Sequence, residues 1–371
     1  MSITEILSDI TNKGASDIFI VAGRELTFKL HGRMNTYGDN RLMPDETANM
    51  IEEIYALADY RDMTQLIESG DDDFSFALKG VARFRINAYK QRGSLSAVIR
   101  VITFNIPNPA DLGIPESIIK LSDKKKGLVL ITGPAGSGKS TTLACMVDYI
   151  NSTREAHIIT LEDPLEYLHM HKKSIVSQRE IISDSDSYLT ALRASLRQSP
   201  DVILLGEMRD PETMSIAMTA AETGHLVLST LHTMGAANTI ERIIDSFPPN
   251  QQHQIYIQLS MVLQAVVSQQ LIPTVDNKII PAFEIMTLNP AIRTNIREQK
   301  LQSIDSVIDT SSKEGMISMN TSLLNLIKNG TISEQTAYSF SPNAENLSNK
   351  IYYSNKPTSP DPKPSDKKFL W

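Results

Sequence analysis

Residues 133–140 have the types and spacing of a loop that binds phosphate groups. The segment reads Gly-Pro-Ala-Gly-Ser-Gly-Lys-Ser and fits the pattern G-x-x-x-x-G-K-[ST]. Glycines allow successive backbone N–H groups to turn inward around the β- and γ-phosphates of a nucleotide. The Lys139 ammonium can bridge oxygens of both phosphates, and the Ser140 hydroxyl can bind Mg²⁺. We therefore predict a nucleotide site with bound Mg²⁺, formed by Gly133, Pro134, Ala135, Gly136, Ser137, Gly138, Lys139, Ser140 and Thr141.

The elements on either side of this loop fit the same site. The apolar, β-branched run at 128–132 is typical of a buried parallel strand. After the loop, Leu143, Met146, Val147 and Ile150 recur at helical spacing. A strand, a glycine-rich loop and a helix thus follow one another in the order that a phosphate-binding loop requires.

Three predicted strands after the loop end in polar side chains that could act on a nucleotide: Glu162 after 157–161, Glu207 after 202–205 and His232 after 225–230. The carboxyl ends of parallel strands meet at one edge of an open α/β sheet, beside the bound ligand. Glu207 follows Gly206, where Asp is the common residue after the apolar run, yet it still supplies a carboxylate near Mg²⁺. His232 could sense the γ-phosphate. Each residue alone is more often a cap or a surface group, but three such strand ends after a phosphate loop favour an active site.

Composition limits the class of protein. The 371 residues carry a net charge of −7, which argues against a nucleic-acid partner, because such proteins need a strongly basic face. The single cysteine, Cys145, excludes an intramolecular disulfide and a four-cysteine zinc site. We find no apolar run approaching 18 residues and no basic, apolar signal segment at the start. The sequence predicts a cytoplasmic protein without direct membrane insertion, held at a membrane, if at all, by partners.

Four regions follow one another along the chain. Residues 1–103 contain alternating apolar runs joined by tight turns, which predict a small α+β domain with an antiparallel sheet. Residues 104–113 hold two prolines and form the predicted linker. Strands alternate with helices in residues 114–340, which favours a parallel sheet with crossover helices; further helices are predicted at 251–271 and 316–340. Residues 341–371 are rich in Pro, Ser and Lys, and we predict a disordered tail.

The motifs taken together resemble one family. The chain contains TGPAGSGKSTT, TLEDPLEYLH, SQRE, SLRQSPDVILLGEMRD, AAETGHLVLSTLHT, RIIDSFPP and AIRTNIRE. In this order and spacing they resemble the PilT group of type IV pilus ATPases, within the secretion-ATPase superfamily. The resemblance covers residues 1–338. It implies an α/β fold with a RecA-like P-loop ATPase core and a small N-terminal PAS-like α+β domain.

The resemblance also implies roles for individual residues. Residues 133–140 would be the Walker A loop for ATP, and Glu162 the catalytic glutamate that orients and deprotonates water. Glu207 would be the Walker B acid that holds hydrated Mg²⁺, and His225 with His232 would form the catalytic His box. Family members are hexamers with nucleotide at subunit contacts, where N-terminal arginines approach the phosphates. By this match the candidates are Arg83, Arg85 and Arg100. Strand alternation places the first two on one sheet face.

The function implied is a homo-hexameric motor that hydrolyses ATP to power pilus retraction, which underlies twitching motility. It would act on an inner-membrane platform protein from the cytoplasmic face of the membrane. The AIRTNIRE segment, 291–298, resembles a motif linked to retraction, with Thr294-Asn295 where Asn-Leu is usual.

Alternatives within the class are an accessory retraction ATPase of the PilU type and a pilus-assembly or secretion ATPase. The last usually carries a four-cysteine module, which a single cysteine excludes. A nucleic-acid motor and a nucleotide-gated scaffold without turnover are the alternatives of other classes.

Overall fold

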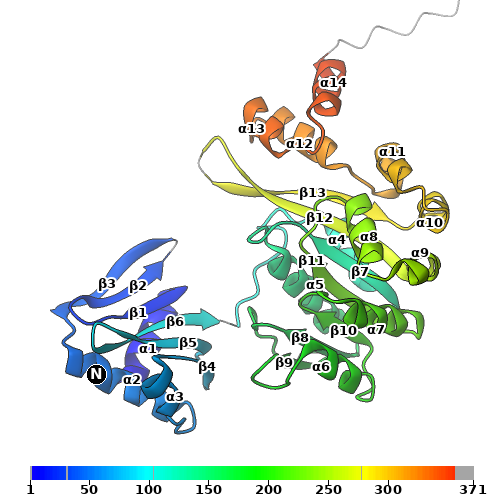
Figure 1. Cartoon of the computed structure of the whole chain (residues 1–371). Coiled ribbons are helices and arrows are strands. Elements are labelled where there is room, and N and C mark those ends of the chain that lie inside the picture. Colours follow the sequence, from blue (N-terminus) through cyan, green and yellow to red (C-terminus); the bar gives the residue numbers. More distant parts are fainter. Residues whose placement is uncertain (1, 31, 103, 277, 356–371) are drawn as a thin grey trace, which may run out of the picture.

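The structure, a computed structural model, describes residues 2–30, 32–102, 104–276 and 278–355. These residues form two β-sheets, one in an N-terminal unit and one in a larger unit, followed by a group of C-terminal helices (Figure 1). In the described part of the chain, no helix combines the length and apolar character needed to cross a membrane.

The N-terminal unit has a six-stranded antiparallel sheet in the order β3-β2-β1-β6-β5-β4. Alternating residues of β5 are buried, as the sequence pattern predicts for a strand with one covered face. The strands are β1 (Asp17–Ile20), β2 (Glu25–Leu30), β3 (Arg33–Arg41), β4 (Asp71–Leu78), β5 (Ala82–Gln91) and β6 (Ser94–Ile102). The helices are α1 (Ile3–Asn12), α2 (Pro44–Leu57) and α3 (Thr64–Ser69).

Strand β3 was not predicted, because only a turn at Gly32-Arg33 is evident in the sequence. Its nine residues are mostly polar and mostly exposed. An edge strand of this kind has no apolar alternation, so its pairing with β2 is the reason that it forms.

The larger unit contains a seven-stranded sheet in the order β13-β12-β7-β11-β10-β8-β9. Every neighbouring pair is parallel except β12 with β13, so the parallel sheet expected from the alternation of strands and helices is present. Its strands are β7 (Gly127–Thr132), β8 (His157–Glu162), β9 (Ile175–Glu180), β10 (Val202–Leu205), β11 (Leu226–Leu231), β12 (Leu263–Pro273) and β13 (Ile279–Thr287).

Helices cover both faces of this sheet, and two clusters of buried apolar side chains lie between the layers. Strand β7 contributes Leu128 and Leu130 to one cluster and Val129 and Ile131 to the other. All four side chains have no exposed surface, as expected for a central parallel strand. The helices are α4 (Glu116–Ile119), α5 (Lys139–Thr153), α6 (Tyr188–Ser195), α7 (Pro211–Glu222), α8 (Ala236–Asp245) and α9 (Pro249–Val262), with a 3₁₀ turn at Lys120–Asp123.

The predicted helix over 251–271 was wrong in its second half. Helix α9 ends at Val262, and the chain continues directly into β12. Nearly every residue of β12 is buried, because helices and β13 surround it. A strand buried on both faces has no period of two, and its sequence cannot be distinguished from a buried helix by periodicity.

Of the C-terminal helices, α10 (Pro290–Arg297) and α11 (Ile304–Thr310) bury their apolar side chains in one of the two clusters of the large sheet. Helices α12 (Met319–Lys328), α13 (Glu334–Phe340) and α14 (Ala344–Asn355) pack around a separate apolar cluster. Two 3₁₀ turns lie at Leu301–Ser303 and Ser312–Glu314. The single helical stretch predicted at 316–340 is divided at Gly330, which has a positive φ of 68°.

The prediction of a disordered tail from 341 onward was wrong for α14. Leu347 has no exposed surface, and Ile351 is 8% exposed, so α14 belongs to the C-terminal core. The rest of the predicted tail, 356–371, lies outside the described residues.

Candidate nucleotide site

The phosphate loop joins β7 to α5 at the carboxyl edge of the sheet, and its glycines are required by close contacts. A Cβ atom added to Gly133 would lie 2.2 Å from the Gln269 carbonyl oxygen. Gly138 has a φ of 87°, and a Cβ there would lie 2.9 Å from the Gln269 side-chain nitrogen. The loop therefore rests directly on β12, and no larger residue fits at either position.

Gln269 is a supporting residue that the sequence motif did not reveal. It is 3% exposed, and its Oε1 accepts a hydrogen bond of 2.8 Å from the Thr142 hydroxyl in α5. The only signal in the sequence was a pair of glutamines inside an apolar run, which is uninformative until β12 is known to lie beneath the loop.

The Lys139 side chain folds back over the loop. Its Nζ donates hydrogen bonds of 2.9 Å to the Gly133 and Pro134 carbonyl oxygens. It also lies 3.4 Å from His232 Nδ1. Burial lowers the pKa of Lys139 from its ordinary value. The ammonium is thus held at the mouth of the loop, where phosphate oxygens would meet it.

Glu207 and His232 lie together, as their positions at adjacent strand ends predict. His232 Nε2 is 3.8 Å from Glu207 Oε2, and the other oxygen of Glu207 contacts the Arg209 guanidinium. The Glu207 side chain is 14% exposed, whereas that of His232 is 57% exposed. The histidine ring, placed between Lys139 and Glu207, therefore remains accessible from the cavity, while the carboxylate is held on both sides.

Glu162 faces the same cavity, a space of about 240 Å³ that is also lined by Lys139, Ser140, Glu207 and His232. Burial raises the pKa of Glu162 from 4.5 to about 7, and the nearby Glu166 and Glu180 add to the effect. A carboxylate with a pKa close to neutrality can accept a proton from water at the working pH. The geometry therefore supplies a candidate base opposite a candidate phosphate loop.

The cavity also contains oxygen ligands that suit Mg²⁺. The Ser140 hydroxyl and the Glu207 carboxylate both line it. Hydroxyl and carboxylate oxygens are the protein ligands that Mg²⁺ takes beside phosphate oxygens and water. The two residues predicted from the sequence as metal ligands therefore fit the ion, whose chemistry is to neutralise charge on the phosphates.

His225 does not join this group. It immediately precedes β11, whereas His232 follows it, so the six residues of the strand keep them about 23 Å apart, at about 3.3 Å per residue step. The His225 ring Nδ1 lies 2.9 Å from the Ala220 carbonyl oxygen at the end of α7. From this position His225 does not contact phosphates at the loop. Its ring contacts the C-terminal end of helix α7 instead.

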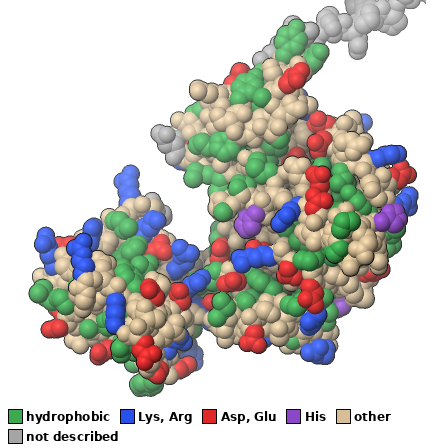
Figure 2. Space-filling view, in the orientation of Figure 1, with side chains coloured by type: hydrophobic (Ala, Val, Ile, Leu, Met, Phe, Trp, Pro, Cys, Tyr) green, Lys and Arg blue, Asp and Glu red, His purple; other side chains and the backbone are tan. Residues whose placement is uncertain are grey.

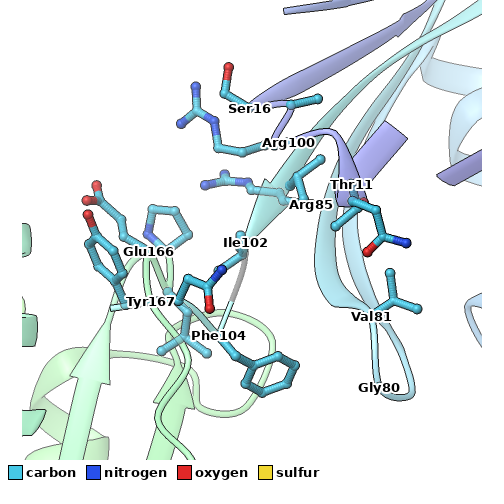
Figure 3. Close-up of a pocket in the computed structure, with 17 residues that line it drawn as sticks. Thr11, Ser16, Gly80, Val81, Arg85, Arg100, Ile102, Phe104, Glu166 and Tyr167 are labelled. Carbon is cyan, nitrogen blue, oxygen red and sulfur yellow. The ribbon is translucent and has the colours of Figure 1, made fainter. Parts of the chain in front are cut away.

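Arg85 and Arg100 lie side by side at the boundary between the two units. They are directly opposite each other in the register of β5 and β6. Both line a cavity of about 760 Å³, and Figure 3 shows their side chains extending toward Glu166 and Tyr167 of the larger unit. This cavity shares Pro164 and Glu166 with the cavity around Glu162. Arg100 Nε lies 3.4 Å from Asp17 Oδ1, which offsets part of the repulsion between the two arginines; a bound anion would offset the rest.

Arg83 points to a different partner. Its Nη2 donates a hydrogen bond of 3.1 Å to Glu180 Oε2 in β9 and one of 2.6 Å to Ser75 Oγ. Glu180 is opposite Glu162 in the register of β8 and β9. Arg83 therefore forms an ion pair with the larger unit, whereas Arg85 and Arg100 line the cavity between the units. Basic side chains gather where the two units face each other (Figure 2).

A further cavity, of about 620 Å³, lies beside the first turn of α5. It is lined by Gly138 and Thr141 of the phosphate-loop region, by Leu112 and Ile114 at the end of the predicted linker, and by the β12–β13 hairpin. Its mostly apolar lining next to the loop suits a flat, apolar group attached to the phosphates. No sequence pattern predicted that residues at the end of the linker would reach this place.

A strand, glycine-rich loop and helix at the edge of a parallel sheet, with a lysine, two carboxylates and a histidine around one cavity, define a P-loop nucleotide-binding protein. The comparison with known families gives the particular family. The model of the Type II/IV secretion system protein family matches residues 1–320, and the chain belongs to this family.

Characterised relatives match most of the chain. The "Twitching motility protein" of Neisseria gonorrhoeae is 44% identical over 321 residues, which cover 86% of this chain and 85% of the relative. The "Type IV pilus retractation ATPase PilT" of Pseudomonas aeruginosa is 43% identical over 337 residues, covering 91% and 97%. A crystal structure of the pilus retraction motor PilT with bound ADP superposes with a TM-score of 0.85 at 45% identity, covering 94% of this chain and 99% of that chain.

Proposed function

We propose that this protein is a motor ATPase that hydrolyses ATP to power retraction of a type IV pilus. It would work as a homo-hexamer on an inner-membrane platform protein, at the cytoplasmic face of that membrane. The observation that carries the proposal is the cavity that brings Lys139, Glu162, Glu207 and His232 together, in a chain related over most of its length to pilus retraction ATPases.

Each residue of the cavity has a role that its surroundings support. The N–H groups of the loop and the Lys139 ammonium bind the β- and γ-phosphates of ATP. Glu162 orients and deprotonates the attacking water, which its pKa of about 7 favours at neutral pH. Ser140 and Glu207 hold Mg²⁺, and His232 donates to the γ-phosphate. The base and ribose occupy the apolar cavity beside Thr141.

The arginines of the N-terminal unit complete the site when the two units close on the nucleotide. Arg85 and Arg100 already extend toward the segment that carries Glu162, so a small rotation of the unit would bring their charge to the phosphates. Arg83, paired with Glu180, guides the approach of the units. We assign the N-terminal unit to the PAS-like domains and the larger unit to the RecA-like cores.

The segment 291–298 supports a role in retraction through its exposed face. It forms most of α10, with Ile292 and Ile296 fully buried and Arg293 Nη1 donating to the Ser260 carbonyl oxygen at 3.0 Å. The buried face fixes the helix on α9, and Arg297 is left exposed for a partner.

The proposal is tested in two steps. Purified protein should hydrolyse ATP at the mass of a hexamer, without stimulation by DNA, and Glu162→Gln should bind ATP without turnover. In cells that lack the retraction motor, the wild-type chain should restore twitching and reduce the number of surface pili, whereas the Gln variant should not.

Loss of pili in cells that lack this chain would identify an assembly motor instead, because assembly motors add subunits. Stimulation by DNA would favour a nucleic-acid motor. Binding without turnover in the wild type would favour a scaffold, and an active monomer would refute the hexamer.

A further inference from the structure

The segment that carries His232 is fixed by two side chains from the distant hairpin β12–β13. The Gly235 N–H donates to Ser268 Oγ at 3.0 Å, and the Ala236 N–H donates to Glu284 Oε1 at 2.8 Å. Helix α8 begins at Ala236, and within the described residues no side-chain cap of its own segment satisfies its first turn. Two side chains of the hairpin therefore hold the chain only a few residues after His232.

Ser268 and Glu284 form a built pair rather than a chance contact. They are directly opposite each other in the antiparallel register of β12 and β13. Ser268 is 1% exposed and Glu284 is 7% exposed, so neither is a surface group. Ser268 is also level with Thr132 of β7, the residue that precedes the phosphate loop. The pair thus ties the His232 segment to the strands that carry the loop.

Glu284 also joins the nucleotide site to the C-terminal helices. Its Oε2 accepts from the Met319 N–H, at 3.5 Å, where α12 begins. Two backbone hydrogen bonds between Ile285 and Ile317, of 2.8 and 3.1 Å, hold β13 to the same segment. In Figure 1 the β12–β13 hairpin runs between α8 and α12. One carboxylate therefore lies between the N-termini of two helices, whose dipoles favour its negative charge.

We propose that Glu284 is a positioning residue for ATP hydrolysis: it holds His232 at the γ-phosphate and links that position to the C-terminal helices. The inference rests on the proposed ATPase function. Reacting groups must be held to within about 0.5 Å, and misplacement by about 1 Å can lower a rate on the order of 10²-fold. The phosphate loop and Lys139 do not depend on Glu284, so ATP binding is preserved when it is lost.

The test measures kcat and KM for ATP on the intact oligomer. Glu284→Ala should lower kcat about 10- to 100-fold with KM changed less than about twofold. Glu284→Gln keeps an oxygen for the Ala236 N–H and should recover most of this loss. Ser268→Ala should lower kcat in the same direction but less. The matched control is Gln270→Ala, because Gln270 is a buried polar residue of the same strand as Ser268 that donates to the Phe340 carbonyl oxygen at 3.3 Å; its kcat should equal that of the wild type.

A double-mutant cycle separates positioning from general damage to the fold. If Glu284 acts through His232, then Glu284→Ala should lower kcat less than about threefold in a His232→Ala protein. Equal losses in both backgrounds, or a raised KM with unchanged kcat in both Glu284→Ala and Ser268→Ala, would overturn the inference.

Should Glu284→Ala fail to fold, the Ser268→Ala cycle decides, since that change removes one hydroxyl only. Absence of turnover in the wild type would refute the ATPase function itself, which keeps the two failures distinct.

Discussion

The partly buried carboxylate of Glu162 yields a prediction that links stability to activity. Burial holds its pKa at about 7, against an ordinary value of 4.5. The folded protein therefore keeps a proton that the unfolded chain releases between these two pH values, and stability falls as the pH rises through this window. The difference in pKa corresponds to about 3 kcal/mol of lost stability above pH 7.

Glu162→Gln removes the charge that burial disfavours. The variant should be more stable than the wild type by up to about 3 kcal/mol at pH 8, and by less than about 1 kcal/mol at pH 5, where the buried carboxyl is already protonated. Urea unfolding at the two pH values measures this difference. Turnover should fall at the same time by about 10²- to 10⁴-fold, the usual contribution of a general base.

Two further results check the reasoning. In the wild type, kcat/KM should rise with pH up to about 7 and then level off, because only the ionised carboxylate accepts a proton. Glu155→Gln is the matched control, since Glu155 is exposed and precedes the opposite end of β8; it should change neither property. Equal stabilisation by Glu162→Gln at pH 5 and pH 8 would refute the raised pKa of Glu162. Full turnover in that variant would refute its catalytic role.

Three other substitutions test separate parts of the structure. Gly133→Ala should abolish ATP binding, measured by fluorescent-nucleotide titration, because its Cβ would lie 2.2 Å from the Gln269 carbonyl oxygen; unchanged affinity would contradict the close contact. Ile292→Ala should lower the free energy of unfolding by about 2–5 kcal/mol, since the side chain is fully buried, whereas Thr294→Ala, at a partly exposed side chain, should change it little. Asp72→Ala should lower it by about 1–3 kcal/mol, because the buried Tyr55 hydroxyl and the Arg61 guanidinium, 2.9 Å from the carboxylate, lose their acceptor; a loss below about 0.5 kcal/mol would show that water replaces Asp72.

Much of the site could be predicted because its parts are local or follow from strand order. The loop at 133–140 depends on one strand, one turn and one helix that are adjacent in the sequence. Glu162, Glu207 and His232 lie around one cavity because β8, β10 and β11 are parallel and end at one edge. Apolar runs followed by these residues were sufficient to indicate that edge.

Other parts could not be predicted, because they depend on which distant elements meet. The family motif contains both His225 and His232, yet the six residues of β11 hold them at opposite ends of this strand. Strand alternation places Arg83 and Arg85 on the same face of β5, but the ion pair with Glu180 of the larger unit is formed by Arg83. The β12 segment is a strand because it pairs with β7 and β13, not because its own pattern requires one.

Residue types and short-range periodicity were enough to predict the phosphate loop, the class of nucleotide chemistry and the order of strands and helices. What holds the loop and the candidate catalytic side chains in place depends on how distant elements pack together. Gln269 beneath the loop and Glu284 behind His232 act across 127 and 48 residues of chain. Such contacts depend on strand register and helix packing, and buried polar pairs of this kind have no signature in a linear pattern.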